Sequence, residues 1–306
     1  MGQGFRLAAS PDFRGCGKRR IQLGGGTGLR KFREVIRTNM RGGCSRLLGV
    51  VLLCQITAVA AAAESTAEFV QRAVNNELEK DRADHSHWLF LEGDLKPGHY
   101  VRQWVAETSD GNLARVVQIN GMKLPAQQQE QRMDAYIANP GVQAKQRKSE
   151  AHDDREAEEM LELLPRAFLW TREGEKGDDV LLHFQPNPDF KPPDLESKVF
   201  AAMEGEMRVD TRAMRIATIK GKLIQSVKIF GGLFGQLDKG GTFEVERRET
   251  GDGVWQITET HVHIQGHALI FHTISEEEDD VKWDFKLLPE KITMRRVEGE
   301  LMEAKE

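Results

Sequence analysis

Cysteine is scarce in this 306-residue sequence, and its three occurrences, Cys16, Cys44 and Cys54, all precede residue 64. If the first 63 residues are a removable leader, the rest of the chain has no thiol. That excludes a thiol enzyme and any disulfide, so a hydrophobic core must stabilise the fold. The sequence also lacks the Gly-x-Ser-x-Gly motif of a nucleophile elbow. We therefore expect no catalytic residues, no cofactor and no enzyme activity.

Long apolar runs are also missing. The most hydrophobic stretch, Leu47–Leu53, continues into the alanine-rich segment Ala58–Ala63, but Gln55 interrupts it, and it is shorter than a membrane-spanning helix needs. Basic residues precede it and small residues follow, an order typical of a secretory signal peptide. We interpret residues 40–63 as that peptide, with cleavage near Ala63, and residues 1–39 as an upstream extension. The expected location is periplasmic or secreted; a membrane anchor is the alternative.

Positive charge is concentrated in this leader. The first 63 residues hold 11 lysines and arginines against two acidic residues, which leaves 32 basic and 46 acidic residues in the rest, a net charge of −14. An acidic chain does not attract the phosphate backbone, so nucleic acid is not an expected partner.

From Glu204 to Leu288 the apolar residues fall on alternate positions. This period of two predicts β-strands with one buried (dry) face and one solvent-exposed (wet) face. The short gaps between the strands force sequential antiparallel pairing. The apolar set is Met207 and Val209, Val227 and Ile229, Phe243 and Val245, Trp255 and Ile257, Leu269 and Phe271, and Trp283, Phe285 and Leu287. The intervening residues, such as Gln256 and Thr258 or Lys282 and Lys286, form the predicted wet face.

Four segments are predicted to be loops or hairpin tips between these strands. They are Lys220-Gly221-Lys222, Gly251-Asp252-Gly253, Gln265-Gly266 and the acidic tract Glu276 to Asp280.

The preceding part of the chain alternates between helical and strand patterns. Helices are predicted at 64–85, 127–137 and 142–168, with a short one at 195–203; strands are predicted at 100–107, 115–119, 168–171 and 180–184. The expected organisation is one curved-sheet domain over 64–290, with a helical insertion at 126–168 and a polar C-terminal tail at 291–306. The segment Lys145 to Glu159 is highly charged, which indicates a solvated helix or an interaction arm.

Histidine supplies the one candidate metal cluster. A hairpin turn at Gln265-Gly266 would place His261, His263, His272 and Glu259 on one face, a set that could bind zinc. The alternative is that these side chains belong to the solvated face of the sheet, and we expect no metal.

A glycine-rich segment, 231–237, contains the apolar residues Leu233, Phe234 and Leu237. It is either a flap over an apolar pocket, hinged at its glycines, or a loop folded back onto the edge of the sheet.

The stretch Met203–Asp210, followed by Arg215–Gly221, resembles the strand-turn-strand signature of the bacterial lipoprotein-carrier superfamily, which includes the outer-membrane lipoprotein-sorting proteins. The resemblance implies an α+β fold in which a strongly curved antiparallel sheet, an incomplete β-barrel, is wrapped around or covered by a few helices. It also implies a concave apolar face that holds acyl chains.

The resulting hypothesis is an exported, non-enzymatic protein that binds a lipid or acylated molecule in the concave face and contacts a membrane surface transiently. The alternative is an envelope scaffold that binds a partner protein and has a filled core. The candidate ligand-binding residues are the large apolar side chains Trp104, Val245, Trp255, Ile257, Leu269, Phe271, Trp283 and Phe285.

Overall fold

The computed structural model describes residues 64–229, 235–267 and 273–305. The predicted leader, residues 1–63, lies outside these ranges. So do Leu233 and Phe234 of the glycine-rich segment, and Leu269, Phe271 and His272 of the candidate sites.

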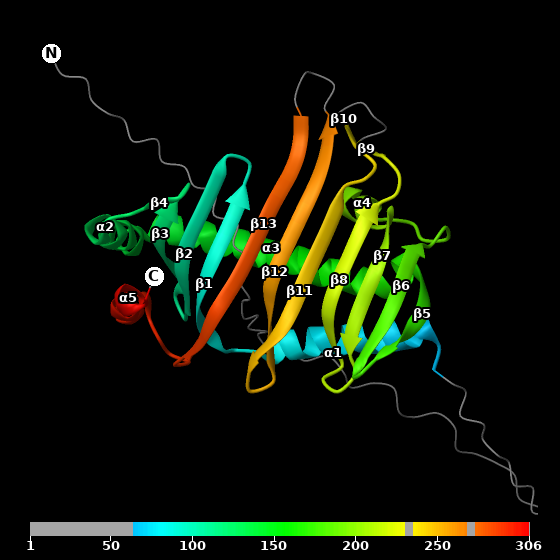
Figure 1. Cartoon of the computed structure of the whole chain (residues 1–306), viewed down its shortest axis with the longest axis horizontal. Helices are drawn as coiled ribbons and strands as arrows, with labels where there is room; N and C mark the ends of the chain where they lie inside the picture. Colours follow the sequence, from blue (N-terminus) through cyan, green and yellow to red (C-terminus); the bar gives the residue numbers. More distant parts are fainter. Residues whose placement is uncertain (1–63, 230–234, 268–272, 306) are drawn as a thin grey trace, which may run out of the picture. The chain divides into compact units, whose positions relative to one another are not determined.

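The described residues form an α+β fold built on a large, curved, unclosed antiparallel sheet of 13 strands with five helices (Figure 1), which confirms the predicted fold class. The helices are α1 (Thr66–Ala83), α2 (Ala126–Ile137), α3 (Pro140–Ala167), α4 (Leu195–Phe200) and α5 (Met294–Glu303). The strands are β1 (His87–Lys96), β2 (His99–Thr108), β3 (Gly111–Ile119), β4 (Met122–Lys123), β5 (Phe168–Lys176), β6 (Asp179–Pro186), β7 (Met203–Asp210), β8 (Arg215–Leu223), β9 (Val227–Ile229), β10 (Gly235–Leu237), β11 (Thr242–Gly251), β12 (Val254–His267) and β13 (Thr273–Leu288).

The first and last long strands meet in the middle of the sheet. The strand order is β4-β3-β2-β1-β13-β12-β11-β8-β7-β6-β5; off this path, β10 pairs with β12 and β9 pairs with β10. Strand β1, which the sequence pattern did not predict, therefore joins the N-terminal meander, β1 to β4, to the strands of the C-terminal meander by pairing with β13. Its segment is a nearly continuous buried apolar run, Trp88 to Leu91, and such a run lacks the alternation that marks a half-buried strand.

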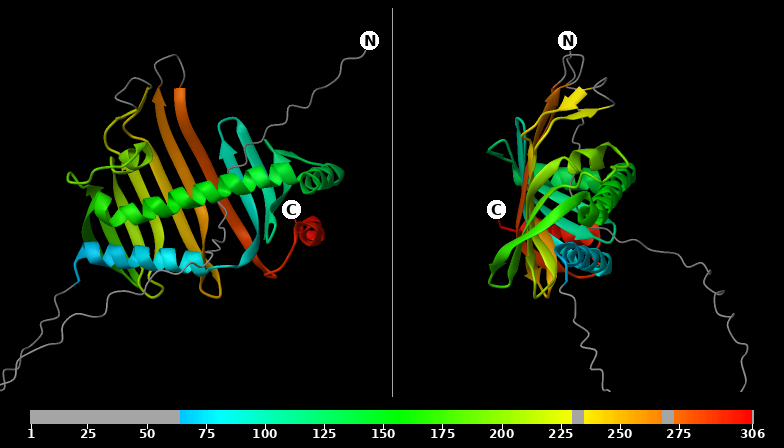
Figure 2. Two further views of the ribbon diagram at one scale, coloured as in Figure 1. Left: turned by 180° about the vertical axis from the view of Figure 1, so that it is seen from behind. Right: turned by 90° about the vertical axis from the view of Figure 1, so that its right-hand side faces the viewer.

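Helices α1 and α3 lie together on one side of the sheet, which we call the inner face (Figure 2). Apolar residues of α1, among them Phe69 and Val74, pack with Leu164 of α3 onto Met207 and Val209 of β7. These residues form the core of the β5–β8 half.

Helices α2 and α5 cover the opposite, outer face at the β1–β3 end. Met133 of α2 and Val297 and Leu301 of α5 are buried in one cluster with Leu91 and Trp104. The prediction of a polar tail at 291–306 is therefore wrong, because residues three and four apart in this segment form an amphipathic helix whose apolar stripe completes the core.

Three of the four predicted loops are also wrong. Residues 220–222 lie within β8, 265–266 within β12 and 276–280 within β13. Only Gly251-Asp252-Gly253 is a turn, with positive φ at all three residues. Glycine and charge clusters resemble turns in sequence, but here they lie in long strands; Gly221, for example, leaves space for the ring of Phe243 on the neighbouring strand.

Candidate functional site

One row of directly paired residues follows the inner face across six strands and changes from apolar to charged. It starts in the core beneath α1 and ends on β1. The row is Met207, Ile219, Val245, Thr260, Asp280 and Asp94. Because directly opposed residues share a face, Asp280 and Asp94 lie on the inner face, the side of the sheet that carries α1 and α3.

The neighbouring row continues this polar region. Lys282 opposes Glu92, and Glu92 opposes Gln103. We call this set the inner polar cluster: Glu92, Asp94 and Lys96 of β1, Gln103 of β2, and Glu278, Asp280 and Lys282 of β13. It contains four carboxyl groups and two lysines, so its fixed charge is acidic.

The contacts within the inner polar cluster are short. The amide of Gln103 donates to Glu92 at 2.6 Å. The Lys282 ammonium lies 3.0 Å from Asp280 and 3.7 Å from Glu92. Lys96 lies 3.0 Å from Asp94 and 3.2 Å from Glu278. Each lysine thus bridges two carboxylates, and Asp94 and Asp280 still face each other with like charge, which disfavours the pairing of these strands.

This environment changes the protonation of Glu92. Burial, followed by the negative charge of Asp280, raises the pKa of Glu92 to about 7, although Lys282 and Gln103 oppose the change. Burial also raises the pKa of Glu278 despite the charge of Lys96. The cluster therefore takes up a proton near neutral pH, which a solvated row of carboxylates does not do.

Three buried acceptor oxygens of the cluster have no hydrogen-bond donor among the described residues. They are Asp94 Oδ1, Gln103 Oε1 and Asp280 Oδ1. Each unmade hydrogen bond of a buried polar group costs about 1–3 kcal/mol. The cluster is thus short of donors as well as of positive charge.

An aromatic cluster adjoins the inner polar cluster. The ring of Phe285 lies 5.3 Å from that of Phe90 and 6.2 Å from that of Trp88. The Lys282 ammonium lies 5.7 Å from the centre of the Phe90 ring. This inner aromatic cluster, Trp88, Phe90 and Phe285, gives the inner face an apolar region directly beside a charged one.

Helix α3 crosses this face and is fixed at its two ends. Near its start, Glu150 accepts a hydrogen bond from Asn112 of β3, and Arg147 donates to the carbonyl of Asp110. Near its end, Leu163 and Leu164 are buried. Residues 151–159 between these contacts contribute no buried apolar side chain. This central segment of α3 therefore supplies no apolar cover for the polar half of the inner face.

Trp283 and Phe285 lie on opposite faces of the sheet, although the alternating pattern of the sequence predicted that they share one face. The pairing of β1 with β13 shifts between Leu89 and Leu91, and the extra residue on β13 is Asp284, with φ of 57°. This β-bulge directs Trp283 outward to the cluster under α5 and Phe285 inward to Trp88 and Phe90.

Among the other candidate ligand-binding residues, Trp104 also lies on the outer face, and its indole donates to the carbonyl of Lys305. Val245 is half-buried on the inner face. Trp255 is buried and Ile257 half-buried, beside a register shift after Glu246. Leu237 packs against the core beneath α4.

The predicted wet face of β12 and β13 is partly wrong. Gln256, Thr258 and Lys282 are buried, and so is Asp280, which was predicted to lie in a loop, whereas Leu287 of the predicted dry face is 48% exposed. The sequence carried no signal for the inner polar cluster, because charged residues at alternate positions resemble a solvated strand face until the covering helices are known.

The predicted pairing of the histidines is wrong, because Gln265-Gly266 is not a hairpin turn. With residues 265–266 inside β12, His261 opposes Asp279 and His263 opposes Glu277 on the outer face. Both imidazoles contact the same oxygen of Asp279, at 2.6 Å and 3.0 Å. Within the described ranges, no group of three or more His, Cys, Asp or Glu side chains is arranged to hold a metal ion.

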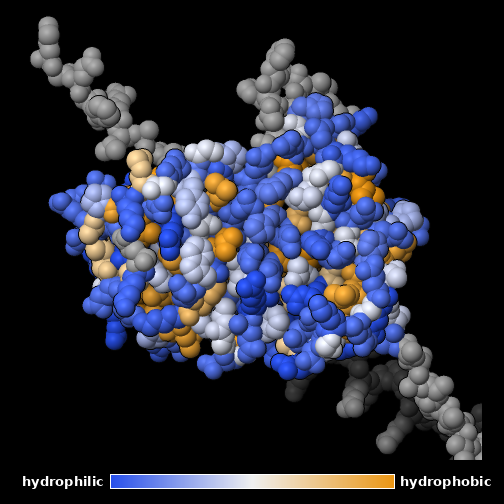
Figure 3. Space-filling model, viewed as in Figure 1, coloured by the Kyte–Doolittle hydropathy of each residue, from blue (hydrophilic) through white to orange (hydrophobic). Residues whose placement is uncertain are grey.

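Figure 3 shows that the outer face is mostly hydrophilic, with scattered apolar residues.

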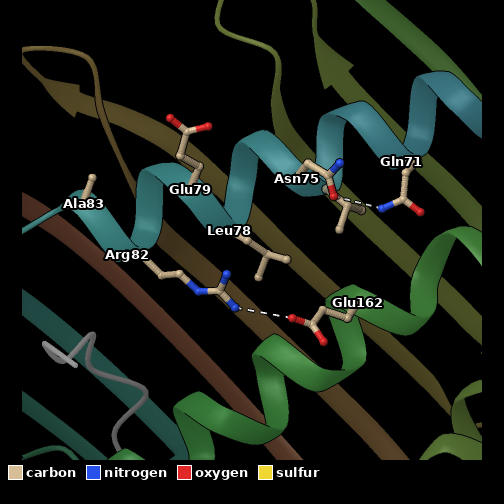
Figure 4. A pocket seen from close by; sticks show the side chains of 8 residues that line it. Gln71, Asn75, Leu78, Glu79, Arg82, Ala83 and Glu162 are labelled. Atoms are coloured by element: carbon tan, nitrogen blue, oxygen red, sulfur yellow. Dashed lines mark hydrogen bonds and ion pairs between the residues drawn. The ribbon is translucent and has the colours of Figure 1, made fainter. Parts of the chain in front are cut away.

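A groove of about 740 Å³ follows the contact between α1 and α3. Figure 4 shows Leu78 at its base and Arg82 of α1 directed toward Glu162 of α3, with their charged atoms 3.3 Å apart. The remaining polar lining includes Gln71, Asn75 and Glu79. These polar side chains are exposed to solvent, and the residues that line the groove include none of the unpaired buried acceptors that distinguish the inner polar cluster.

Helix length and hydropathy give no candidate for a membrane span among the described helices. Comparison with known proteins gives no match to a family model, a curated protein or a solved structure.

Proposed function

We propose that this protein is exported and binds an amphiphilic ligand, a lipid or an acylated molecule, on the inner face of its sheet without chemically changing it. The apolar chain would lie against the inner aromatic cluster, and the polar end would reach the inner polar cluster. The observation that carries this proposal is the direct contact of the two clusters, through Lys282 and Phe90, on the face that α3 crosses.

The mixed character of the inner face favours an amphiphile over a wholly apolar molecule. A hydrocarbon placed against Glu92 and Asp280 would leave both carboxyl groups desolvated without compensation. An amphiphile suits both regions, because its polar end can pair with the charged groups while its chain packs against the aromatic rings.

The β-bulge at Asp284 provides a matched pair of variants for a test. Phe285→Leu removes an aromatic ring from the inner face, and Trp283→Leu removes one from the outer face two residues away. Native mass spectrometry of the purified protein, followed by organic extraction, would identify copurifying lipid. We expect Phe285→Leu to lose most of the bound ligand and Trp283→Leu to retain it.

Equal ligand content in the two variants would show that the inner aromatic cluster does not bind the chain. A wild-type protein purified from its native envelope without any lipid would contradict the proposal. That result would favour the alternative of an envelope scaffold that uses charged surfaces such as Lys145 to Glu159.

A further inference from the structure

We infer that the inner polar cluster recognises a primary ammonium group, so that the ligand is an amphiphile with a protonated amine at its polar end. This inference rests on the proposed function and specifies the chemistry of the ligand. It depends on two independent features of the cluster, its deficit of hydrogen-bond donors and its deficit of positive charge.

The donor deficit is visible in side chains that are almost fully buried. Gln103 is 4% exposed and Asp280 is 8% exposed, yet Gln103 Oε1 and Asp280 Oδ1 accept no hydrogen bond among the described residues. Asp94 Oδ1 on the intervening strand is in the same state. A ligand that completes this site must bring N–H or O–H donors, and an ammonium group brings three.

The charge deficit selects among such ligands. Asp94 and Asp280 oppose each other directly, and the two lysines of the cluster are already shared between four carboxyl groups. A cation beside Asp94 and Asp280 removes their repulsion, whereas a phosphate or carboxylate would increase it. Anionic headgroups are therefore excluded, and neutral alcohols supply fewer donors and no charge.

The need for both hydrogen-bond donors and positive charge favours a primary ammonium group over a quaternary one. A trimethylammonium group has the required charge but no N–H, so the three acceptor oxygens would remain unpaired. Charge-assisted hydrogen bonds are about twice as strong as neutral ones, so we expect the primary ammonium to bind at least about tenfold more tightly.

Titration calorimetry with four ligands of one chain length tests this inference: decylammonium, decyltrimethylammonium and decanoate, each below its micellar concentration, and decanol below its solubility limit. We expect decylammonium to bind most tightly and decanoate most weakly. The variant Asp280→Asn should reduce the preference for decylammonium about tenfold. Asp94→Asn should do the same and serves as a second variant if the first does not fold.

Asp279→Asn is the matched control, because Asp279 is adjacent in sequence but lies on the outer face with His261. It should leave the preference unchanged. Equal affinity for decylammonium, decyltrimethylammonium and decanol would overturn the inference while the proposed amphiphile binding stands, and would mean that the acceptor oxygens bind water. If none of the four ligands binds, the proposed function fails, and this inference fails with it.

Discussion

The guanidinium of Arg215 forms two hydrogen bonds of 2.8 Å with the carboxylate of Glu77, Nε to Oε2 and Nη2 to Oε1. Glu77 is completely buried on α1, and it also accepts a hydrogen bond from the backbone N–H of Ile216 and contacts Arg247 of β11. This ion pair fixes α1 to two strands of the inner face and so determines where the helix lies over the sheet.

We predict that Glu77→Gln destabilises the fold by about 1.5–3 kcal/mol, because it removes the more deeply buried of the two carboxylates, Glu77 and Asp81, that bind the guanidinium groups of Arg215 and Arg247. Urea denaturation measures the change. Glu79→Gln is the control, since Glu79 is exposed on the same helix and its substitution should have little effect. A similar stability for the two variants would show that the Glu77 contacts do not hold α1 in place.

The second prediction concerns pH. The pKa of Glu92 rises from 4.5 to about 7 on folding, chiefly through burial, so between these values the folded state holds a proton that the unfolded state has released. Stability must therefore fall as pH rises from about 4.5 to 7 and then level off. The loss is of the order of 3 kcal/mol.

Unfolding free energies of the wild type and of Glu92→Gln, measured from pH 5 to 8, isolate this contribution. The variant lacks the titrating group, so the difference between the two curves should change with pH below 7 and become constant above it. A constant difference across the whole range would mean that Glu92 keeps an ordinary pKa in the folded protein.

The third prediction uses His261. Partial burial lowers the pKa of His261, but hydrogen bonds and charges from Asp279 and Glu259 outweigh it and raise the pKa above the ordinary value of 6.5. The stability from this contact is fully present below pH 6.5 and is lost as pH rises through the folded-state pKa. Because 32% of the side chain is exposed, solvent makes the contribution small.

Proton NMR titration of the imidazole should show a lower pKa for His261 in Asp279→Asn. Glu277→Gln, which alters a carboxylate two residues away that binds Gln265, should leave the pKa of His261 nearly unchanged. A pKa of His261 that is equal in the wild type and in Asp279→Asn would contradict the imidazole–carboxylate contact.

The fourth prediction compares two glycines. A Cβ at Gly221 would overlap the ring of Phe243, so Gly221→Ala should destabilise the β8–β11 pairing by about 1–3 kcal/mol. Gly299 lies exposed within α5 with no atom near the added Cβ, so Gly299→Ala should stabilise the protein by about 0.5–1 kcal/mol. Thermal unfolding should show a lower melting temperature for Gly221→Ala and a higher one for Gly299→Ala. If both melting temperatures shift in the same direction, the surroundings of one of these glycines differ from those in the structure.

The lipid-binding hypothesis depended on assigning faces from alternation. That assignment works where the strand itself carries no extra residue, as at Met207 and Val209 of β7, which pair in regular register with β6 and whose side chains are buried beneath α1. It fails after an irregularity, because one extra residue such as Asp284 reverses every following side chain. A bulge leaves no reliable trace in a single sequence, since its position depends on the partner strand.

The sequence by itself determined the α+β class, the helices at α1, α2 and α3, and the antiparallel pairing of neighbouring strands, because helical and strand periods and short connections are local properties. Only the tertiary structure decided that β1 pairs with β13, that Glu77 is buried and that the inner face is charged at its centre. Those features join residues far apart in the chain, such as Glu92 with Lys282 and Glu77 with Arg215, whose burial follows from packing rather than from local pattern.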